Sequence, residues 1–378
     1  MLTRRLSALT LSVVIVLSAC GGSATPAPSS VPPPPPSSAA PKPAASAPAA
    51  SASAKPAAST SASAKPAGSA SGSAAAKPAA SSVGSVKSAY VVLSTHTLPS
   101  WIADDQGFFK QQGLDVQFSY IAGSTAAVPA LLSGELGILH ASPASAVQAA
   151  LKGGDTVVLA QHIGTADNRL VARPGINSIA DLKGKSLAVT RAGTVSDLIA
   201  REMLRRNNLV PDKDVSITFI GDQNAMAAAL QTGTIQAALV DVPFYLINVR
   251  NGAHVVFNTR ELNYPYPVDG IVSSRKFVKE HPEQVDAFLK GYLQGIRFEK
   301  ANPQKTQEIL GKNTKETDAE LLKTAYDNEM EILVDPPVPS LDGIKTILPL
   351  FEGEGHDPAE FVDNGPLMKA VQELGSAK

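Results

Sequence analysis

The feature that most constrains the fold is an abrupt change of composition near Lys87. Before this residue the chain has six basic side chains and neither an acidic nor an aromatic one. Since the whole chain carries 33 Lys and Arg and 34 Asp and Glu, 27 basic and 34 acidic residues remain from Lys87 onward, a net charge of −7. We expect the folded region to begin there. Its acidic balance excludes nucleic acid as the expected partner, because phosphate binding needs a basic surface.

The first twenty residues have the pattern of an export signal. Two arginines precede the apolar run Leu6 to Leu17, and two small residues precede Cys20. The end of this segment, LSAC, also resembles the lipobox of bacterial lipoproteins, in which the cysteine is acylated and the signal is cut before it. This resemblance implies that residues 1–20 are a lipoprotein signal peptide, that Cys20 is the lipidation site, and that the protein is extracytoplasmic and membrane-anchored through lipid only. An ordinary secretory signal is the alternative.

Residues 21–86 are rich in Ala, Ser and Pro, with the loose repeat Ala-Lys-Pro-Ala. Such a segment buries too little apolar area to offset the entropy of ordering its backbone, so we predict a disordered linker. It would hold the folded region away from the membrane. A glycosylated or proteolysed stalk is the alternative interpretation.

From residue 90 the chain alternates short apolar runs with amphipathic segments, which indicates an α/β fold with mostly parallel sheets flanked by helices. We predict strands at 90–94, 115–121, 136–140, 156–161, 186–190, 215–220, 237–240 and 254–257. We predict helices at 100–112, 125–133, 144–152, 195–208, 224–231 and 243–250, and a helical C-terminal tail at 282–300, 303–310, 317–333, 341–351 and 358–374.

Two similar βα blocks followed by a helical tail favour two lobes. We assign residues 87–177 and 271–378 to the first lobe and 178–270 to the second, with crossings at 173–178 and 270–273. A single doubly wound sheet is the alternative.

Small hydroxyl residues and glycines follow most of the predicted strands, where open α/β sheets bind ligands. The exposed N–H groups of helix starts suit an anionic ligand group. The residues of this kind are Thr97, Ser124, Ser142, Thr194 and Ser196. Each of them could instead be a helix N-cap.

Aromatic, charged and imidazole side chains complete the set of candidate ligand contacts. Trp101 and Tyr264, with Tyr266 close by in a proline-containing loop, could stack on a planar ligand. Arg191 could pair with an acidic group, and Asp241 or Asp269 with an amino group. His140 could donate a hydrogen bond to the ligand, or form an acid–base pair with His96. Phe244, Trp101 and the charged residues have ordinary core or surface roles as alternatives.

No sequence pattern indicates catalysis. The chain has neither a phosphate-binding G-x-x-x-x-G-K-[ST] loop nor a G-x-S-x-G elbow, and its six histidines lack metal-ligand spacing. Its single cysteine excludes an internal disulfide framework and any Cys-cluster metal site. No apolar run reaches the roughly 18 residues of a membrane-spanning helix. We therefore expect no enzyme activity, no cofactor and no metal.

Five segments, in order along the chain from about residue 90 to 302, resemble the solute-binding proteins of ABC transporters, in the branch that takes sulfonates, nitrate, bicarbonate and thiamine precursors. They are GFFKQQGLDV at 107–116, ALLSGE at 130–135, DLKGKSLAV at 181–189, AALQTGTIQA at 228–237 and PEQVDAFLK at 282–290. Gly137 and Gln236 depart from the family pattern, which has Asp at both positions.

The resemblance implies the two-lobed periplasmic-binding-protein fold of type 2, with a small ligand held between hinged lobes. It implies Thr97, Ser124, Ser142, Thr194, Ser196 and Asp241 as ligand-binding residues, and permease and ATPase subunits on other chains as partners. The expected function is to capture a small anionic, aromatic or heterocyclic solute, as a monomer, for an ABC importer. The alternatives are an enzyme of the thiamine-pyrimidine or menaquinone type on the same fold, and a ligand-sensing surface lipoprotein.

Overall fold

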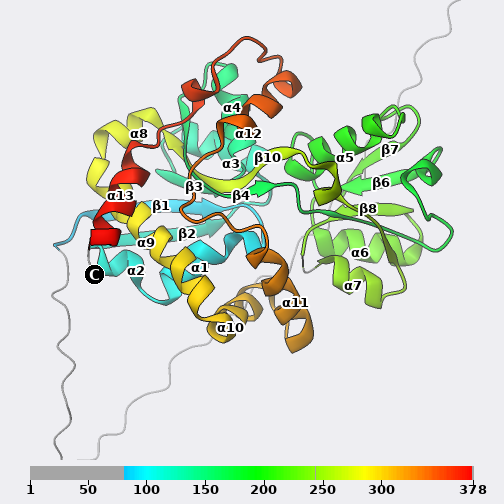
Figure 1. Ribbon diagram of the computed structural model, residues 1–378, viewed down its shortest axis with the longest axis horizontal. Helices are drawn as coiled ribbons and strands as arrows, with labels where there is room; N and C mark the ends of the chain where they lie inside the picture. Colours follow the sequence, from blue (N-terminus) through cyan, green and yellow to red (C-terminus); the bar gives the residue numbers. More distant parts are fainter. Residues whose placement is uncertain (1–80, 243, 377–378) are drawn as a thin grey trace, which may run out of the picture. The chain divides into compact units, whose positions relative to one another are not determined.

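The structure is a computed structural model that describes residues 81–242 and 244–376. The predicted signal peptide with Cys20 and most of the predicted linker lie outside the described residues. The linker prediction extended to residue 86, but strand β1 begins at Gly84 and pairs with its neighbour along its whole length. The described residues form two five-stranded sheets, each flanked by helices (Figure 1).

The first sheet has the strand order β2-β1-β3-β10-β4. Its strands are β1 (Gly84–Tyr90), β2 (Leu114–Tyr120), β3 (Ile138–Ala141), β4 (Thr156–Thr165) and β10 (Pro265–Ser274). β1 pairs in parallel with β2 and β3, whereas β10 is antiparallel to β3 and to β4. Four strands therefore run in one direction and β10 runs against them.

The second sheet repeats this plan in the order β7-β6-β8-β5-β9. Its strands are β5 (Arg169–Ala172), β6 (Ser186–Val189), β7 (Ser216–Phe219), β8 (Ala237–Val240) and β9 (His254–Asn258). β6 is parallel to β7 and β8, and β5 is antiparallel to both of its neighbours. Two separate, mostly parallel sheets confirm the predicted two-lobed α/β architecture.

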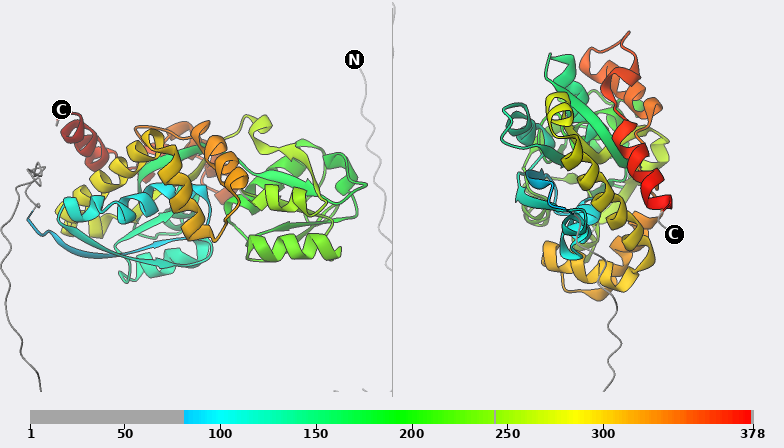
Figure 2. Two further views of the ribbon diagram at one scale, coloured as in Figure 1. Left: turned by 90° about the horizontal axis from the view of Figure 1, so that it is seen from below. Right: turned by 90° about the vertical axis from the view of Figure 1, so that its left-hand side faces the viewer.

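Helices cover the faces of the sheets. The first sheet is accompanied by α1 (Leu98–Asp105), α2 (Phe108–Gln111), α3 (Ser124–Leu132) and α4 (Pro143–Leu151), and the second by α5 (Val195–Arg206), α6 (Gln223–Thr232) and α7 (Phe244–Arg250). The predicted helical tail is present as α8 (Arg275–Glu280), α9 (Pro282–Ala301), α10 (Pro303–Thr314), α11 (Ala319–Met330), α12 (Leu341–Ile347) and α13 (Gly365–Ser376). Most of the tail packs on the first sheet, and α11 lies where the two sheets meet (Figures 1 and 2).

The chain crosses between the sheets at residues 166–168 and again at 259–264, and both crossings precede the predicted ones. We name residues 84–165 and 265–376 the first lobe and residues 169–258 the second lobe. The sequence did not indicate β5 because its four residues (RLVA) are all buried and do not alternate. It did not indicate β10 because two prolines made its start resemble a loop; register shifts along the β10–β4 pair accommodate that start.

The helix α9 holds α1 and α2 against the first sheet. Phe109 of the GFF segment stacks on Phe288 with ring centroids 4.8 Å apart. Gly295 of α9 lies so close to α1 that a Cβ there would be 2.2 Å from the carbonyl oxygen of Pro99. The glycine therefore permits two helices to pack almost backbone to backbone, which positions the turn before α1.

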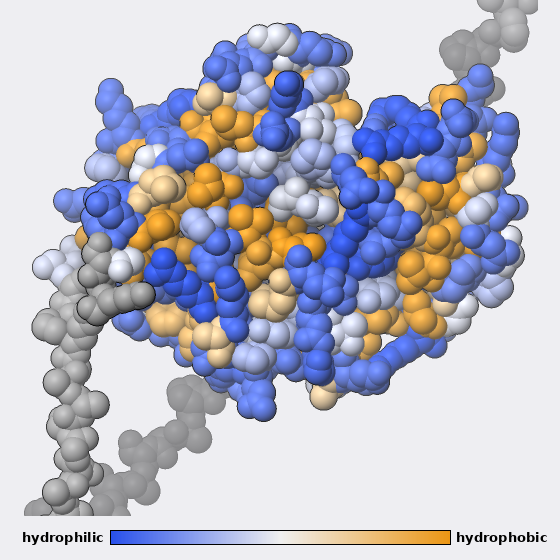
Figure 3. Space-filling model, in the orientation of Figure 1, coloured by the Kyte–Doolittle hydropathy of each residue, from blue (hydrophilic) through white to orange (hydrophobic). Residues whose placement is uncertain are grey.

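The surface of the face seen in Figure 3 has apolar patches over each lobe, with a hydrophilic strip between them. Among the described residues, none of the helices combines the length and the apolar character needed to cross a bilayer.

Candidate functional site

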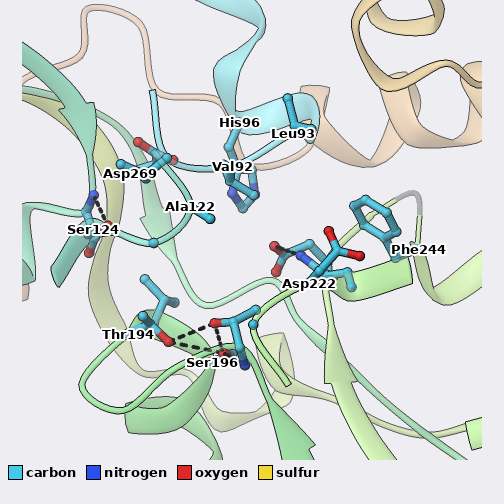
Figure 4. Close-up of a pocket in the computed structure, with 18 of the residues that line it drawn as sticks. Val92, Leu93, His96, Ala122, Ser124, Thr194, Ser196, Asp222, Phe244 and Asp269 are labelled. Atoms are coloured by element: carbon cyan, nitrogen blue, oxygen red, sulfur yellow. Dashed lines mark hydrogen bonds between the residues drawn. The ribbon is translucent and has the colours of Figure 1, made fainter. Parts of the chain in front are cut away.

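A pocket of about 110 Å³ lies between the two lobes, at the carboxyl ends of strands from both sheets. The first lobe contributes the segments that follow β1, β2 and β3 and part of β10, and the second lobe those that follow β6, β7 and β8 (Figure 4). Six of the eleven predicted ligand-binding residues line it: Ser124, Ser142, Thr194, Ser196, Asp241 and Asp269. The pocket wall also includes His96, which the sequence suggested only as an acid–base partner of His140, and Phe244, for which a core role was one interpretation.

The hydroxyl residues of the first lobe connect its turns to one another. The Ser142 N–H donates to Ser124 Oγ at 3.2 Å, and Ser142 Oγ donates to the carbonyl oxygen of Pro267 at 3.1 Å. These bonds tie the starts of α3 and α4 to β10. The two serines therefore shape the pocket wall as well as line it.

A second hydroxyl cluster lies on the opposite wall. Thr190 Oγ1 is 2.9 Å from Thr194 Oγ1 and 2.8 Å from Ser196 Oγ, and Thr194 Oγ1 donates to the carbonyl oxygen of Arg191 at 2.7 Å. The alternative interpretation of these residues as helix caps holds by position for Ser142 and Thr194. Both occupy N-cap positions, of α4 and α5, but neither makes a side-chain capping hydrogen bond.

Asp241 lies at the end of β8, in the second lobe, and neutral amides hold its carboxylate. The Asn168 side chain donates to Oδ1, and the Gln223 side chain donates to Oδ2 at 2.6 Å. The Asp241 N–H in turn donates to the side-chain Oε1 of Gln223 at 2.8 Å. Burial raises the pKa of Asp241, although His96 opposes this effect. The carboxylate therefore has a fixed position, but its negative charge is poorly compensated.

His96 lies on the first-lobe wall, with Nε2 3.9 Å from Glu329 Oε2. Thr95 Oγ1 donates to the same carboxylate oxygen at 2.7 Å. Burial lowers the pKa of His96, but the carboxylates of Glu329, Asp241 and Asp269 outweigh burial and raise it. Burial raises the pKa of Glu329 to about 7. The charge of this wall therefore depends on pH near neutrality.

His140 lies behind the pocket and does not line it. Its Nδ1 is 2.7 Å from Ser100 Oγ, and its Nε2 is 3.3 Å from Asp269 Oδ1. Burial works to raise the pKa of Asp269, but His140 and the other histidines keep it below its usual range. The order serine, histidine, aspartate resembles that of a hydrolase, yet Ser100 is completely buried and is not part of the pocket wall. The arrangement therefore positions Asp269 and gives no nucleophile to the pocket.

His140, His162 and Asp269 are the group of described residues close enough together to hold a metal ion. Both ring nitrogens of His162 are already used: Nε2 donates to the carbonyl oxygen of His96 at 2.8 Å, and Nδ1 accepts from the Tyr292 hydroxyl at 2.7 Å. Burial lowers the pKa of His162 to about 3, so the ring is neutral. A metal ion would have to displace Tyr292, and these donors do not fit a preformed metal site.

The other predicted ligand contacts lie outside the pocket wall. Thr97 is buried, and its hydroxyl donates to the carbonyl oxygen of Val92 at 2.7 Å. Trp101 is buried in a core cluster, with its ring edge-on to Tyr90. Tyr264 stacks on the fully buried Tyr266, and the Arg206 guanidinium lies 4.9 Å from the ring centroid of Tyr264. The aromatic residues of the proline-containing segment therefore belong to the core.

Arg191 is exposed beside the pocket. A Cβ on Gly123 would lie 3.1 Å from its Cδ, and one on Gly221 would lie 3.6 Å from its Nη2. Because both glycines line the pocket, the Arg191 side chain lies along its rim.

Sequence reasoning missed the amide residues that hold Asp241. Gln223 lies in the turn between the predicted strand at 215–220 and the predicted helix at 224–231, but a glutamine there indicated no particular function. Asn168 follows β4 in the crossing between lobes, and no local signal connects it to a residue 73 positions later. The strand predicted at 90–94 was placed too late in the chain. β1 ends at Tyr90, and Val91, Val92 and Leu93 form an apolar part of the pocket wall.

The two lobes, their two crossings and the pocket between them define a periplasmic binding protein fold. The family described as "NMT1/THI5 like" matches residues 94–306, more than half of the chain, and the chain belongs to this family. The binding protein YtlA of Bacillus subtilis (strain 168) is 23% identical over 248 residues, which cover 64% of this chain and 74% of that protein.

Solved structures show the same fold. A protein from Bordetella bronchiseptica RB50 aligns with a TM-score of 0.70 at 22% identity, covering 77% of this chain and 98% of that one. The alkanesulfonate-binding protein SsuA from Xanthomonas axonopodis pv. citri, bound to MOPS, aligns with a TM-score of 0.63 at 16% identity, covering 77% and 100%. A sulfonate-binding protein of an ABC transporter, from Methylobacillus flagellatus KT, also has this fold. These similarities confirm the resemblance to the solute-binding proteins of ABC transporters.

Proposed function

We propose that this protein captures a small solute in the pocket between its lobes and delivers it to an ABC importer whose permease and ATPase are other chains. The observation that carries this proposal is that both lobes line one pocket while the chain crosses between them twice. A ligand in this pocket would contact both lobes and stabilise their association. Names of relatives as binding proteins support binding rather than catalysis.

The pocket can be tested by filling it. Val195 lines the pocket from the second lobe, and Val195→Trp should remove any rise in melting temperature caused by a bound compound. Leu132→Trp, at an exposed position of α3, is the matched control and should keep the response. The compounds screened for a rise in melting temperature are sulfonates, nitrate, amines and aminopyrimidines. Responses that survive Val195→Trp, or a panel without any response, would count against the proposal.

Recovery of the compound distinguishes transport from catalysis. A compound that stabilises the protein should be recovered unchanged after prolonged incubation, as measured by mass spectrometry. Conversion of the compound would favour an enzyme of the thiamine-pyrimidine or menaquinone type instead.

We further propose that the protein is extracytoplasmic and anchored by lipid at Cys20. Cys20→Ala should abolish incorporation of labelled palmitate and release the protein from the membrane fraction. A Cys20→Ala protein that still incorporates the label and remains bound would contradict the anchor.

A further inference from the structure

The pocket contains a carboxylate, that of Asp241, to which no charged side chain among the described residues donates a hydrogen bond, although the His96 imidazole acts on it from the opposite lobe. Both oxygens of Asp241 accept hydrogen bonds, from the neutral amides of Asn168 and Gln223. Among residues 81–242 and 244–376, Asp241 takes part in none of the ion pairs, in contrast to Asp269, which lies 3.3 Å from His140. Asp241 is half-buried, and an ionised carboxylate that is shielded from bulk water is costly unless an opposite charge accompanies it. The missing charge can come from the ligand.

The other charged groups of the pocket wall also favour a positively charged ligand. Asp269, which is paired with His140, and Asp222, which is exposed and caps α6, add two carboxylates to the wall, and His96 is the one basic side chain among the described residues that line the pocket. The carboxyl group of Asp222 and the ring of Phe244 lie on the same side of the pocket in Figure 4. Apolar side chains form much of the rest, including Val91, Leu93 and Val268.

Two features would favour an anion, and each is weaker. The N-termini of α3, α4 and α5 reach the pocket without side-chain caps, but a helix end carries only about half a unit charge. Arg191 lies along the rim over Gly123 and Gly221 and is exposed. Neither an arginine nor a lysine is among the described residues that line the pocket.

We infer that the pocket binds a small organic cation, whose protonated nitrogen donates to Asp241 and whose apolar body packs against the valines and Phe244. This inference rests on the proposed solute-binding function and specifies its ligand class. Asn168 and Gln223 hold the carboxylate before the ligand arrives, so little ordering is needed on binding. Asn168 also belongs to a crossing between the lobes, so a cation at Asp241 bonds to a group fixed by that crossing.

Matched compounds that differ only in the polar group test the ligand class. The probes are butylamine, 1-butanol and 1-butanesulfonate, together with benzylamine, benzyl alcohol and phenylmethanesulfonate. Dissociation constants are measured at pH 7.5 by ligand-observed NMR on the purified chain. We expect each amine to bind about tenfold tighter than its alcohol, as a hydrogen bond between charged groups allows. The sulfonates should bind least well.

Substitution of the carboxylate tests the site. Asp241→Asn should bring the amine down to the affinity of the alcohol, and Asp241→Ser serves the same purpose if the asparagine variant does not fold. Asp115→Asn is the control, because Asp115 is exposed at the start of β2, away from the carboxyl ends of the strands. It should preserve the preference for the amine.

The outcomes separate this inference from the proposed function. Sulfonates that bind tightest, and that lose affinity in Arg191→Gln, would overturn the cation while leaving solute binding intact. An amine preference that persists in both Asp241 variants would overturn the assigned site. If none of the probes binds, or if their binding persists in Val195→Trp, both the ligand class and the proposed function fail.

Discussion

At the scale of the residue, the wall behind the pocket is a chain of buried titratable groups. His96 reaches Glu329, and Glu299 is buried nearby with neither carboxyl oxygen hydrogen-bonded within the described part of the chain. Burial raises the pKa of Glu299 well above its usual value, and Glu329 adds to the effect. The interior therefore holds carboxyl groups that stay protonated where exposed ones are charged.

Glu299 should make the protein less stable as pH rises. Above its usual pKa of 4.5 the unfolded chain loses the proton while the folded protein keeps it, so the free energy of unfolding falls with pH. Glu299→Gln removes this dependence and should increase the free energy of unfolding by about 1–3 kcal/mol at pH 7.5, and by less at pH 4.5. Urea unfolding at both pH values measures the difference. Glu354→Gln, at an exposed position, should have no such effect, and equal gains at both pH values would contradict the explanation.

His96 should make cation binding depend on pH. Its pKa lies above 6.5, so at lower pH the imidazolium repels a cation in the pocket, while Glu329 loses charge over the same range. The charged groups that act on His96 are Glu329, Asp241, Asp269 and Asp167, and all are acidic. Affinity for butylamine should therefore rise between pH 6 and pH 8.5, and less steeply in His96→Gln. Affinity for 1-butanol should stay constant, and an amine affinity that is highest at pH 6 would contradict this prediction.

At the scale of the element, the close contact of α9 with α1 depends on Gly295. A Cβ there would meet the carbonyl oxygen of Pro99 at 2.2 Å, so Gly295→Ala must push the helices apart. We expect a loss of ~3 kcal/mol in the free energy of unfolding, typical of overpacking. Gly375→Ala in α13 is the control, since a Cβ there meets nothing within 4 Å, and it should be neutral or slightly stabilising. Calorimetric melting of the two variants gives the comparison, and equal melting temperatures would refute the packing argument.

At the scale of the whole folded region, ion pairs join the second lobe to α11 of the first. Arg250 at the end of α7 donates to Asp318, the N-cap of α11, at 2.7 Å, and approaches Glu320 at 3.5 Å. The hydrogen bond from Arg250 lowers the pKa of Asp318 to about 2. The pair therefore persists throughout the ordinary pH range and helps hold the lobes together.

Loss of this pair should loosen the association of the lobes. Arg250→Ala is expected to weaken binding of butylamine by about two- to fivefold, the range of exposed ion pairs, and to increase the radius of gyration in small-angle scattering. Arg205→Ala, which removes an ion pair within α5 to Glu202, is the control and should change neither. Equal effects of the two substitutions would mean that the Arg250 pair does not act between the lobes.

The crossings connect this large-scale arrangement to the pocket. Thr259 of the second crossing bonds to the backbone of Asn168 in the first, at 2.8 and 3.0 Å, and Asp167 pairs with Arg169 at 2.6 Å. The Asn168 side chain then reaches Asp241. A ligand that bonds to Asp241, as we propose, would contact a group that the two crossings hold in place.

The sequence by itself determined where the folded region begins within a few residues, the alternation of strands and helices, the family, and the turns that carry Ser124, Ser142, Thr194, Ser196 and Asp241. All of these features depend on patterns of residue types within short stretches of the chain. Only the tertiary structure decided that β5 belongs to the second sheet and β10 to the first, that Tyr264 belongs to the core while Val91 faces the pocket, and that Asn168 holds Asp241. These outcomes depend on pairings between residues far apart in the chain, for which no local pattern carries a signal.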